Sequence, residues 1–151
     1  MAYVPDFPDF NGNIESVKCS FGSNPFYGTY EYHVDFTFNS VPHKLVFDLD
    51  GKCSELFGVN VYYSKDGEGS QSFMYTHFHG DLDFDVPVIK QSFNNLKLEM
   101  FSDSRLRSSC TFTFTGVDGK LLVYFYNSHN GYYPHMVILT SGEDTIFKTF
   151  L

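Results

Sequence analysis

Apolar and polar residues alternate in short runs along nearly the whole chain after residue 13, and this period of two constrains the fold more than any other feature. Successive side chains of a β-strand point to opposite faces of a sheet, so a period of two is typical of strands with one buried face. The pattern predicts about ten strands, at 14–21, 30–38, 43–49, 57–63, 72–79, 95–101, 110–115, 120–126, 135–140 and 145–151. The segments between them carry the Gly, Asn, Asp, Ser or Pro residues that turns require. We expect neither a helix of normal length nor an internal repeat.

The aromatic content agrees with a β-rich core. The 151 residues include 18 Phe and 11 Tyr but no Trp, and such side chains are favoured in strands and bury a large area. We therefore predict an all-β fold, an antiparallel β-sandwich of jelly-roll type with about ten strands. Because Pro5, Pro8 and Gly12 interrupt residues 1–13, we predict an irregular N-terminal arm there and a single sandwich domain over 14–151.

Two dipeptides predict tight hairpins near the end of the chain. Asp118-Gly119 and Asn130-Gly131 suit two-residue type I′ turns, in which both central residues need a positive φ. With both turns formed, the last strands make a meander in which Phe112 lies opposite Phe125. One face of that meander is apolar and is predicted to be core, with Phe112, Phe114, Val123, Phe125, Met136 and Ile138. The opposite face holds Thr111, Thr113, Tyr124, Tyr126, His135 and Val137.

The segment 126–135, YNSHNGYYPH, is the strongest candidate for a ligand site. Exposed aromatic rings beside amides combine stacking with directional hydrogen bonds, as in loops that bind sugars or proteins. The candidate ligand-binding residues are Tyr126, Asn127, His129, Asn130, Tyr132, Tyr133 and His135. In the alternative interpretation, the tyrosines only cover the end of the sheet. The Thr and Tyr face beside the segment is a second candidate surface, although one face of an antiparallel sheet is commonly just solvated.

A possible metal site lies in the stretch SFMYTHFHGDLDFDVP. Alternation puts His77 and His79 on one face of a strand, as two zinc ligands require, and a third ligand such as His33 or His135 would have to come from elsewhere. The alternative is an ordinary strand with two half-exposed histidines. We nominate no catalytic residue.

The same stretch continues into three alternating aspartates. Asp81, Asp83 and Asp85 could offer carboxylate oxygens to calcium. Their interleaved apolar neighbours also fit an amphipathic edge strand with its charges in water. We expect no cofactor, and keep calcium or zinc as the minor hypothesis.

Charge and hydropathy argue against two classes of partner. The chain has 10 Lys and Arg against 18 Asp and Glu, a net charge of −8, so we expect no binding to nucleic acid or to an anionic membrane surface. No stretch approaches the ~18 apolar residues of a membrane span, so we expect no membrane insertion. The first residues lack the features of a signal peptide, and the compartment stays open: cytoplasmic, or secreted if such a peptide has been removed.

The three cysteines constrain the chemistry only weakly. Cys19, Cys53 and Cys110 have no CxxC spacing, so they predict neither a zinc ribbon nor a fully paired disulfide framework. At most one disulfide can form within the chain.

The segments CSELFGVNVYYSKDG, HFHGD, VPVIKQSFNNLKLEMFSD and CTFTF follow one another between about residues 53 and 115. Their order and spacing resemble the CUB family, secreted modules that fold as a β-sandwich of two antiparallel sheets. The resemblance implies a sandwich topology. The family's second disulfide is absent, because His79 precedes Gly80 where the family has Cys. Asp50 and Asp103 match two acidic positions of calcium-binding members, but the intervening acidic position is not matched.

Together these features predict a non-enzymatic binding or adhesion module that recognises a glycan or protein ligand through the 126–135 hairpin and the Thr and Tyr face. Two alternatives come from other classes. One is a structural protein that self-assembles into a homo-oligomer through exposed strand edges. The other is a metal-dependent β-barrel enzyme that uses His77 and His79.

Overall fold

The computed structural model describes residues 7–24, 29–49, 56–65, 70–76, 92–103, 107–128 and 135–151. These residues form strands and no helix, so the predicted all-β antiparallel fold is confirmed. The strands are β1 (Phe10–Asn24), β2 (Thr29–Phe38), β3 (Val41–Asp48), β4 (Leu56–Lys65), β5 (Gln71–Thr76), β6 (Phe93–Asp103), β7 (Arg107–Thr115), β8 (Gly119–Ser128), β9 (Met136–Ser141) and β10 (Asp144–Phe150). Each overlaps one of the segments that the alternation predicts.

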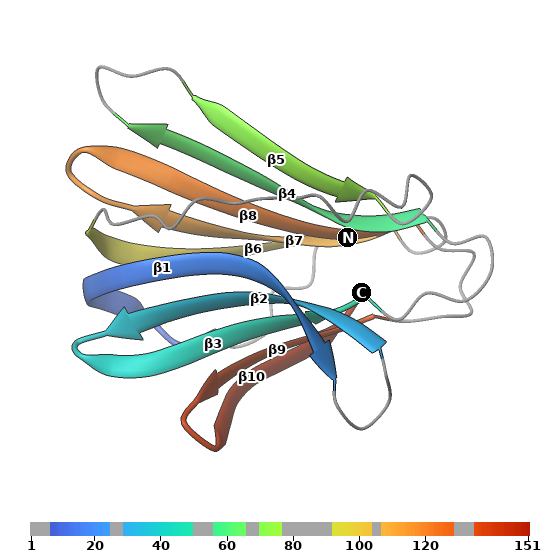
Figure 1. The fold of residues 1–151 in the computed structure, drawn as a ribbon, viewed down its shortest axis with the longest axis horizontal. Coiled ribbons are helices and arrows are strands. Elements are labelled where there is room, and N and C mark those ends of the chain that lie inside the picture. The colour runs from blue at the N-terminus through green and yellow to red at the C-terminus, as the bar shows by residue number, and fades with distance from the viewer. Residues whose placement is uncertain are drawn as a thin grey trace.

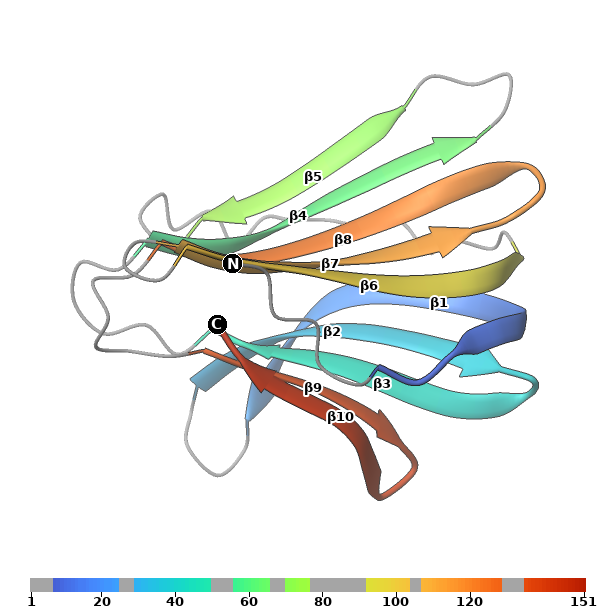
Figure 2. The same cartoon turned by 180° about the vertical axis from the view of Figure 1, so that it is seen from behind.

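The described strands belong to one sheet, in the order β10-β9-β3-β2-β1-β6-β7-β8-β4-β5. The sheet folds back on itself at the junction of β1 and β6 and gives two layers (Figures 1 and 2). We call β1, β2, β3, β9 and β10 the first half-sheet, and β6, β7, β8, β4 and β5 the second half-sheet. The sheet is not closed into a barrel. Because the layers are parts of one continuous sheet, the predicted sandwich of jelly-roll type is not confirmed.

The core lies between the two half-sheets and is rich in aromatic rings. Along β8, Leu121, Val123 and Phe125 are fully buried, and the residues between them are half-buried. The rings of Phe47 and Phe125 stack across the layers with their centroids 4.7 Å apart. The alternation in the sequence therefore corresponds to one inward and one outward face on each layer.

Strand β1 begins at Phe10, so the last four residues of the predicted N-terminal arm belong to the sheet. Phe10 pairs with Leu96 of β6 and is buried. Its ring packs edge-on against Phe36 and Phe38 of β2. The strand continues through Gly12. A Cβ atom at this position would lie 2.9 Å from the Phe38 ring, so the glycine makes room for that ring.

The hairpin between β7 and β8 turns one residue earlier than predicted. The Gly116 N–H donates to the Gly119 carbonyl at 2.9 Å, so Val117 and Asp118 are the central residues. Neither Asp118 nor Gly119 has the positive φ that a type I′ turn needs. The type I′ turn predicted at Asp118-Gly119 is therefore wrong.

This shift changes strand partners but not faces. Phe112 pairs with Val123 and Phe114 with Leu121, whereas the prediction put Phe112 opposite Phe125. A displacement by two positions keeps each residue on its own side of the sheet. The predicted burial of Phe112, Phe114, Val123 and Phe125 is confirmed.

The predicted meander does not continue from β8 into β9. Strand β8 pairs with β7 and β4, whereas β9 pairs with β3 and β10 in the first half-sheet. Val137 and Leu139 of β9 are buried, and Met136 and Ile138 are only half-buried, which is the reverse of the prediction. The error arises because the phase of β9 was deduced from a pairing with β8 that does not form. The Asn130-Gly131 turn lies outside the described residues.

A tight turn with positive φ at both central residues joins β2 and β3. Asn39 and Ser40 have φ of 48° and 68°, and Phe38 pairs with Val41 across the turn. Asparagine tolerates this region because its short polar side chain can hydrogen-bond locally. Here the Asn39 Oδ1 accepts the Asn13 N–H at 3.0 Å, which fixes the turn against β1.

Candidate functional site

The structure describes three of the predicted ligand-binding residues of segment 126–135. Asn127 and His135 are fully buried. The Asn127 Nδ2 donates to the Leu151 carbonyl at 3.0 Å, and the His135 Nδ1 donates to the Asp48 carbonyl at 2.8 Å. These two side chains therefore stabilise the fold through buried hydrogen bonds to the backbone and are not accessible to a ligand. Of the three residues, only Tyr126 is half-exposed. Outside the described residues lie His129, Asn130, Tyr132 and Tyr133.

The predicted metal ligands belong to the segment 77–85. Outside the described residues lie His77, His79, Asp81, Asp83 and Asp85. In the part of the chain that the structure describes, no three or more His, Cys, Asp or Glu side chains are grouped so that they could hold a metal ion.

The predicted Thr and Tyr face forms the outer side of the second half-sheet. Thr111 of β7 pairs with Tyr124 of β8, where the prediction put Thr111 beside Tyr126. On its other side Tyr124 pairs with Asn60 of β4, so no residue of β9 takes part in this face. The predicted neighbours from β9 are wrong for the same reason as the predicted meander. We call Asn60, Tyr62, Thr111, Thr113, Tyr124 and Tyr126 the tyrosine face.

A stacked pair of rings stands at the centre of the tyrosine face. The ring centroids of Tyr124 and Tyr126 are 5.6 Å apart and their planes differ by 22°. Both side chains are half-exposed, and Tyr62 on the neighbouring strand β4 is 42% exposed. Because all three lie on strands of one sheet, the backbone ladder holds their positions relative to one another.

Polar groups surround the stacked pair. The Thr111 hydroxyl and the Asn60 amide belong to the residues that flank Tyr124 on the adjacent strands. Further out on β6, Lys97 and Glu99 are exposed and their charged groups lie 3.5 Å apart. Rings, hydroxyls and an amide together can stack on a flat ligand and hydrogen-bond its edge.

The outer side of the first half-sheet has a different chemistry. The Lys44 Nζ lies 3.6 Å from Asp35, and the His33 Nε2 lies 3.4 Å from Glu31. Charged and imidazole groups therefore occupy the middle of that face, where the second half-sheet carries tyrosine and threonine.

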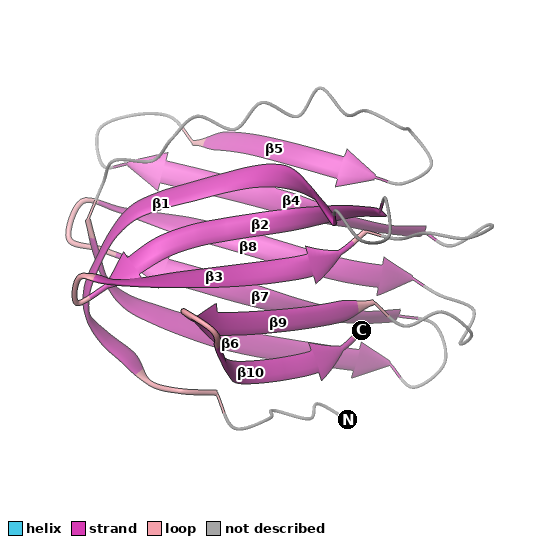
Figure 3. Cartoon of the chain, turned by 60° about the horizontal axis from the view of Figure 1, so that its bottom comes forward, coloured by secondary structure: helices cyan, strands magenta, loops and turns pink. Residues whose placement is uncertain are grey.

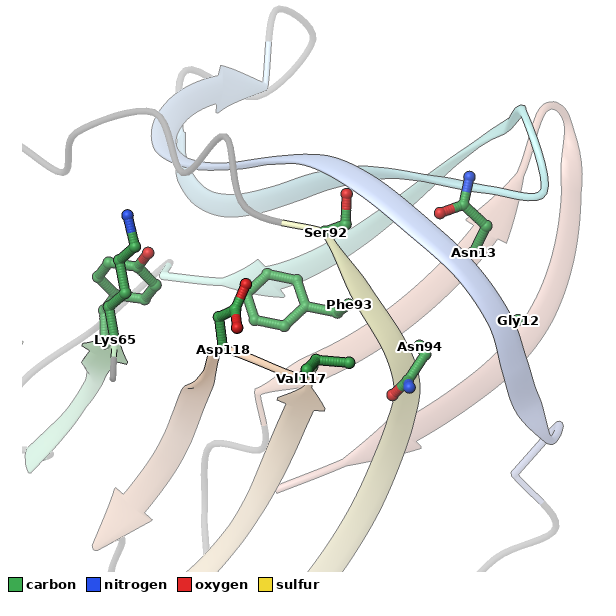
Figure 4. A pocket seen from close by; sticks show the side chains of 10 residues that line it. Gly12, Asn13, Lys65, Ser92, Phe93, Asn94, Val117 and Asp118 are labelled. Atoms are coloured by element: carbon green, nitrogen blue, oxygen red, sulfur yellow. The ribbon is translucent and has the colours of Figure 1, made fainter. Parts of the chain in front are cut away.

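A cleft of about 750 Å³ opens at the end of the molecule where β4 ends and β6 begins. The lining residues are Gly12, Asn13, Tyr63, Lys65, Ser92, Phe93, Asn94, Gly116, Val117 and Asp118. Figure 4 shows Lys65 and Asp118 on one side, Asn13 on the other, and the Phe93 ring between them. Sequence reasoning missed this cleft, because its walls come from four segments that are distant in the chain.

No protein-family model, curated protein or solved structure matches this chain. The resemblance of residues 53–115 to the CUB family therefore stays a prediction. Within the described residues there is also no helix long and apolar enough to cross a membrane.

Proposed function

We propose that the protein is a non-enzymatic binding module that recognises a glycan or protein ligand through the tyrosine face. The stacked pair of Tyr124 and Tyr126 carries the proposal. A tyrosine side chain offers a large rigid surface at low entropic cost, with a hydroxyl at its end. Because the two rings stack on each other, each turns one face to its neighbour and leaves its other face and its hydroxyl to contact the apolar side of a sugar ring or a flat side chain.

The surroundings of the pair favour a glycan over a protein. Thr111, Asn60 and the tyrosine hydroxyls are neutral groups that both donate and accept hydrogen bonds, which suits the hydroxyls of a sugar. Tyr126 is also the first residue of the segment 126–135, so the proposal treats the predicted binding hairpin as an extension of the tyrosine face.

Replacing Tyr124 and Tyr126 together by alanine should remove most of the affinity. Hot-spot residues contribute about 2 kcal/mol or more each, so the loss should exceed roughly 30-fold per ring. The melting temperature should fall moderately, because both rings are partly buried and stack on each other, so binding is compared at a temperature at which the variant is folded. Binding is measured on a glycan array and by pull-down of proteins, and the array separates the two ligand classes.

Phe150→Ala provides the matched control, since Phe150 is 57% exposed and lies on β10, outside the tyrosine face. A Tyr132→Ala/Tyr133→Ala variant tests the hairpin separately. Equal binding by the wild type and by the Tyr124/Tyr126 variant would contradict the role of the tyrosine face.

One observation favours self-assembly as a second candidate function. Strands β5 and β10 are the edges of the sheet among the described strands. Each carries an exposed apolar side chain, Met74 at 59% and Phe150 at 57% exposed. Exposed edges can pair with another chain. A mass in solution that stays monomeric over a wide range of protein concentrations would exclude this function. Metal analysis of the same sample tests the metal-enzyme alternative with His77 and His79.

A further inference from the structure

The two half-sheets have the same internal order of strands. From their junction outwards, the first reads β1, β2, β3, β9, β10 and the second reads β6, β7, β8, β4, β5. Each is a meander of three consecutive strands followed by a hairpin. The hairpins are exchanged: β4 and β5 follow the first meander in sequence but join β8, and β9 and β10 follow the second meander but join β3 (Figure 3).

The pairing of β2 with β3 and that of β7 with β8 repeat at an offset of 78 residues, whereas β1–β2 and β6–β7 do not follow this offset. The pair Phe36 and His43 joins β2 to β3. The residues 78 positions later, Phe114 and Leu121, form a pair that joins β7 to β8. The same offset converts every other pair between β2 and β3 into a contact between the corresponding residues of the second meander.

The exchanged hairpins take equivalent places beside the two meanders, although the pairing inside the hairpins does not repeat at 78. Phe47 of β3 pairs with Val137 of β9. Phe125 follows Phe47 by 78 positions, Val59 precedes Val137 by 78 positions, and these two also pair, between β8 and β4. The register between β3 and β9 therefore agrees with the register between β8 and β4, although neither pairing determines the other.

Corresponding residues also touch one another across the core. Three ring contacts join residues 78 positions apart: Phe36 with Phe114 at 5.4 Å, Phe47 with Phe125 at 4.7 Å, and Phe57 with His135 at 4.0 Å between centroids. When two copies are related by a two-fold axis, a residue of one copy contacts the corresponding residue of the other copy only if both lie next to that axis. The three contacts therefore mark a pseudo-two-fold axis that passes between the half-sheets.

Short strings in the sequence recur at nearly the same spacing. Phe-Thr-Phe stands at 36–38 and at 112–114, and two of the three Lys-Leu dipeptides stand at 44–45 and at 120–121. This spacing is two residues shorter than the structural offset, and a shift of two keeps each residue on the same face of its strand. The expectation that the chain has no internal repeat does not hold at the level of the fold.

We infer that the chain is an internal duplication, in which β1–β5 and β6–β10 are two copies of one five-stranded unit that complete each other by exchanging their last hairpins. Each unit is thus completed by the hairpin of a second copy of the same unit, as in a domain-swapped dimer. Fusion into one chain keeps the two units at a high effective concentration.

Outward-facing residues also correspond between the two copies, but their side chains differ in chemistry. The counterparts of Thr111 and Tyr124 are His33 and Val46, and the counterpart of Tyr126 is Asp48. Buried positions recur at this offset between β2–β4 and β7–β9, as at Val34 and Phe112, but not between β1 and β6. The stacked tyrosines occur in one copy only. The inference does not depend on the proposed function.

The contact between Phe57 and His135 gives a direct test, because the two counterparts have different chemistry. The His135 Nδ1 donates to the carbonyl of Asp48 at 2.8 Å. The counterpart of Asp48 is Tyr126, so a histidine introduced in place of Phe57 should reach the Tyr126 carbonyl, although Tyr126, unlike Asp48, is also paired with Gly58 of β4. The variant Phe57→His/His135→Phe exchanges the two rings across the axis without changing their total volume.

His135→Phe alone should raise the unfolding equilibrium constant about tenfold through loss of a buried hydrogen bond. Adding Phe57→His should recover most of this loss, and a long-range ¹H–¹⁵N spectrum should show the introduced imidazole protonated at Nδ1. Stability is measured by urea denaturation of the full chain. A double variant no more stable than His135→Phe, including one that does not fold, would overturn the inference.

Tyr32 and Phe125 provide the matched control, because their rings lie 6.2 Å apart across the same core but are not counterparts. Adding Phe125→Tyr to Tyr32→Phe should give no recovery, and a recovery as large as that at the axis would count against the duplication. A circular permutant that places β6–β10 before β1–β5, with new termini between Thr76 and Ser92, is expected to fold and melt close to the wild type. A permutant that does not fold would contradict the equivalence of the two units.

Discussion

Replacing Phe125 by alanine is expected to lower the free energy of unfolding by about 3–5 kcal/mol. The side chain is fully buried, and its ring stacks on Phe47 with centroids 4.7 Å apart. The rings of Phe112 and Tyr32 lie at 5.7 and 6.2 Å. The substitution therefore removes a large apolar transfer energy and leaves a cavity whose walls are rigid rings that cannot collapse into it.

A loss of this size is a large part of the about 5–15 kcal/mol that stabilises a typical domain. It is measured as the change in unfolding free energy from urea denaturation. Phe150→Ala is the matched control, because its ring is 57% exposed, and surface substitutions of this kind stay within about 0.5 kcal/mol. A loss at Phe125 no greater than at Phe150 would mean that the two half-sheets do not pack against each other.

The sequence was sufficient to predict where the strands lie, because alternation is a local signal. Leu121, Val123 and Phe125 of β8 all point inwards as the pattern predicts. Alternation does not tell which strand lies beside another. The pairing of β4 with β8 and of β9 with β3 joins segments far apart in the chain, and it rests on the packing of the two layers.

Turn residues were a weaker guide than alternation. Asp118-Gly119 favours a type I′ turn, but the strands pair one residue earlier, where Thr115 and Lys120 are opposed. Two consecutive positive φ values occur instead at Asn39-Ser40, a dipeptide with a weaker preference for such turns. Pairing along the whole strand outweighs a preference of this size at the turn.

The candidate site was predicted in part for the same reason. Tyr124 and Tyr126 share a face because they are two residues apart, which the sequence shows directly. Asn60 and Tyr62 join them only because β4 pairs with β8. His135 was a poor candidate for ligand binding, because its ring is buried in the core. There it donates a hydrogen bond to the carbonyl of Asp48, a residue far away in the sequence.

A rise in pH from 8 to 11 is expected to destabilise the protein through two buried thiols. Cys19 and Cys110 are free and buried in the described part of the chain, and Cys53 lies outside it. Burial raises the pKa of the Cys19 thiol from 9.0 to about 12, against a smaller opposing effect of its hydrogen bond with Tyr32. Burial also raises the pKa of Cys110 and of the Tyr32 phenol.

The direction of the effect follows from proton binding in the two states. The folded protein keeps these groups protonated, whereas the unfolded chain releases the thiol protons above about pH 9, near the unperturbed pKa. Unfolding is therefore favoured increasingly as the pH rises from about 9 to the folded pKa, and the stabilisation is fully present below pH 9. At pH 11 the expected loss is about 2–3 kcal/mol for each thiol, about 5 kcal/mol for the two thiols together.

The measurement is the free energy of unfolding from urea denaturation at several pH values between 8 and 11, with a reductant present so that no disulfide forms. A Cys19→Ala/Cys110→Ala variant is the control. Its stability at pH 8 should be lower, because two core side chains are shortened, but its loss between pH 8 and 11 should be smaller than that of the wild type by about 5 kcal/mol. Equal losses in both proteins would show that the two thiols are accessible to water in the folded state. Such a result would contradict the burial of β1 and β7 against the opposite half-sheet, since Cys19 and Cys110 are inward-facing residues of those strands.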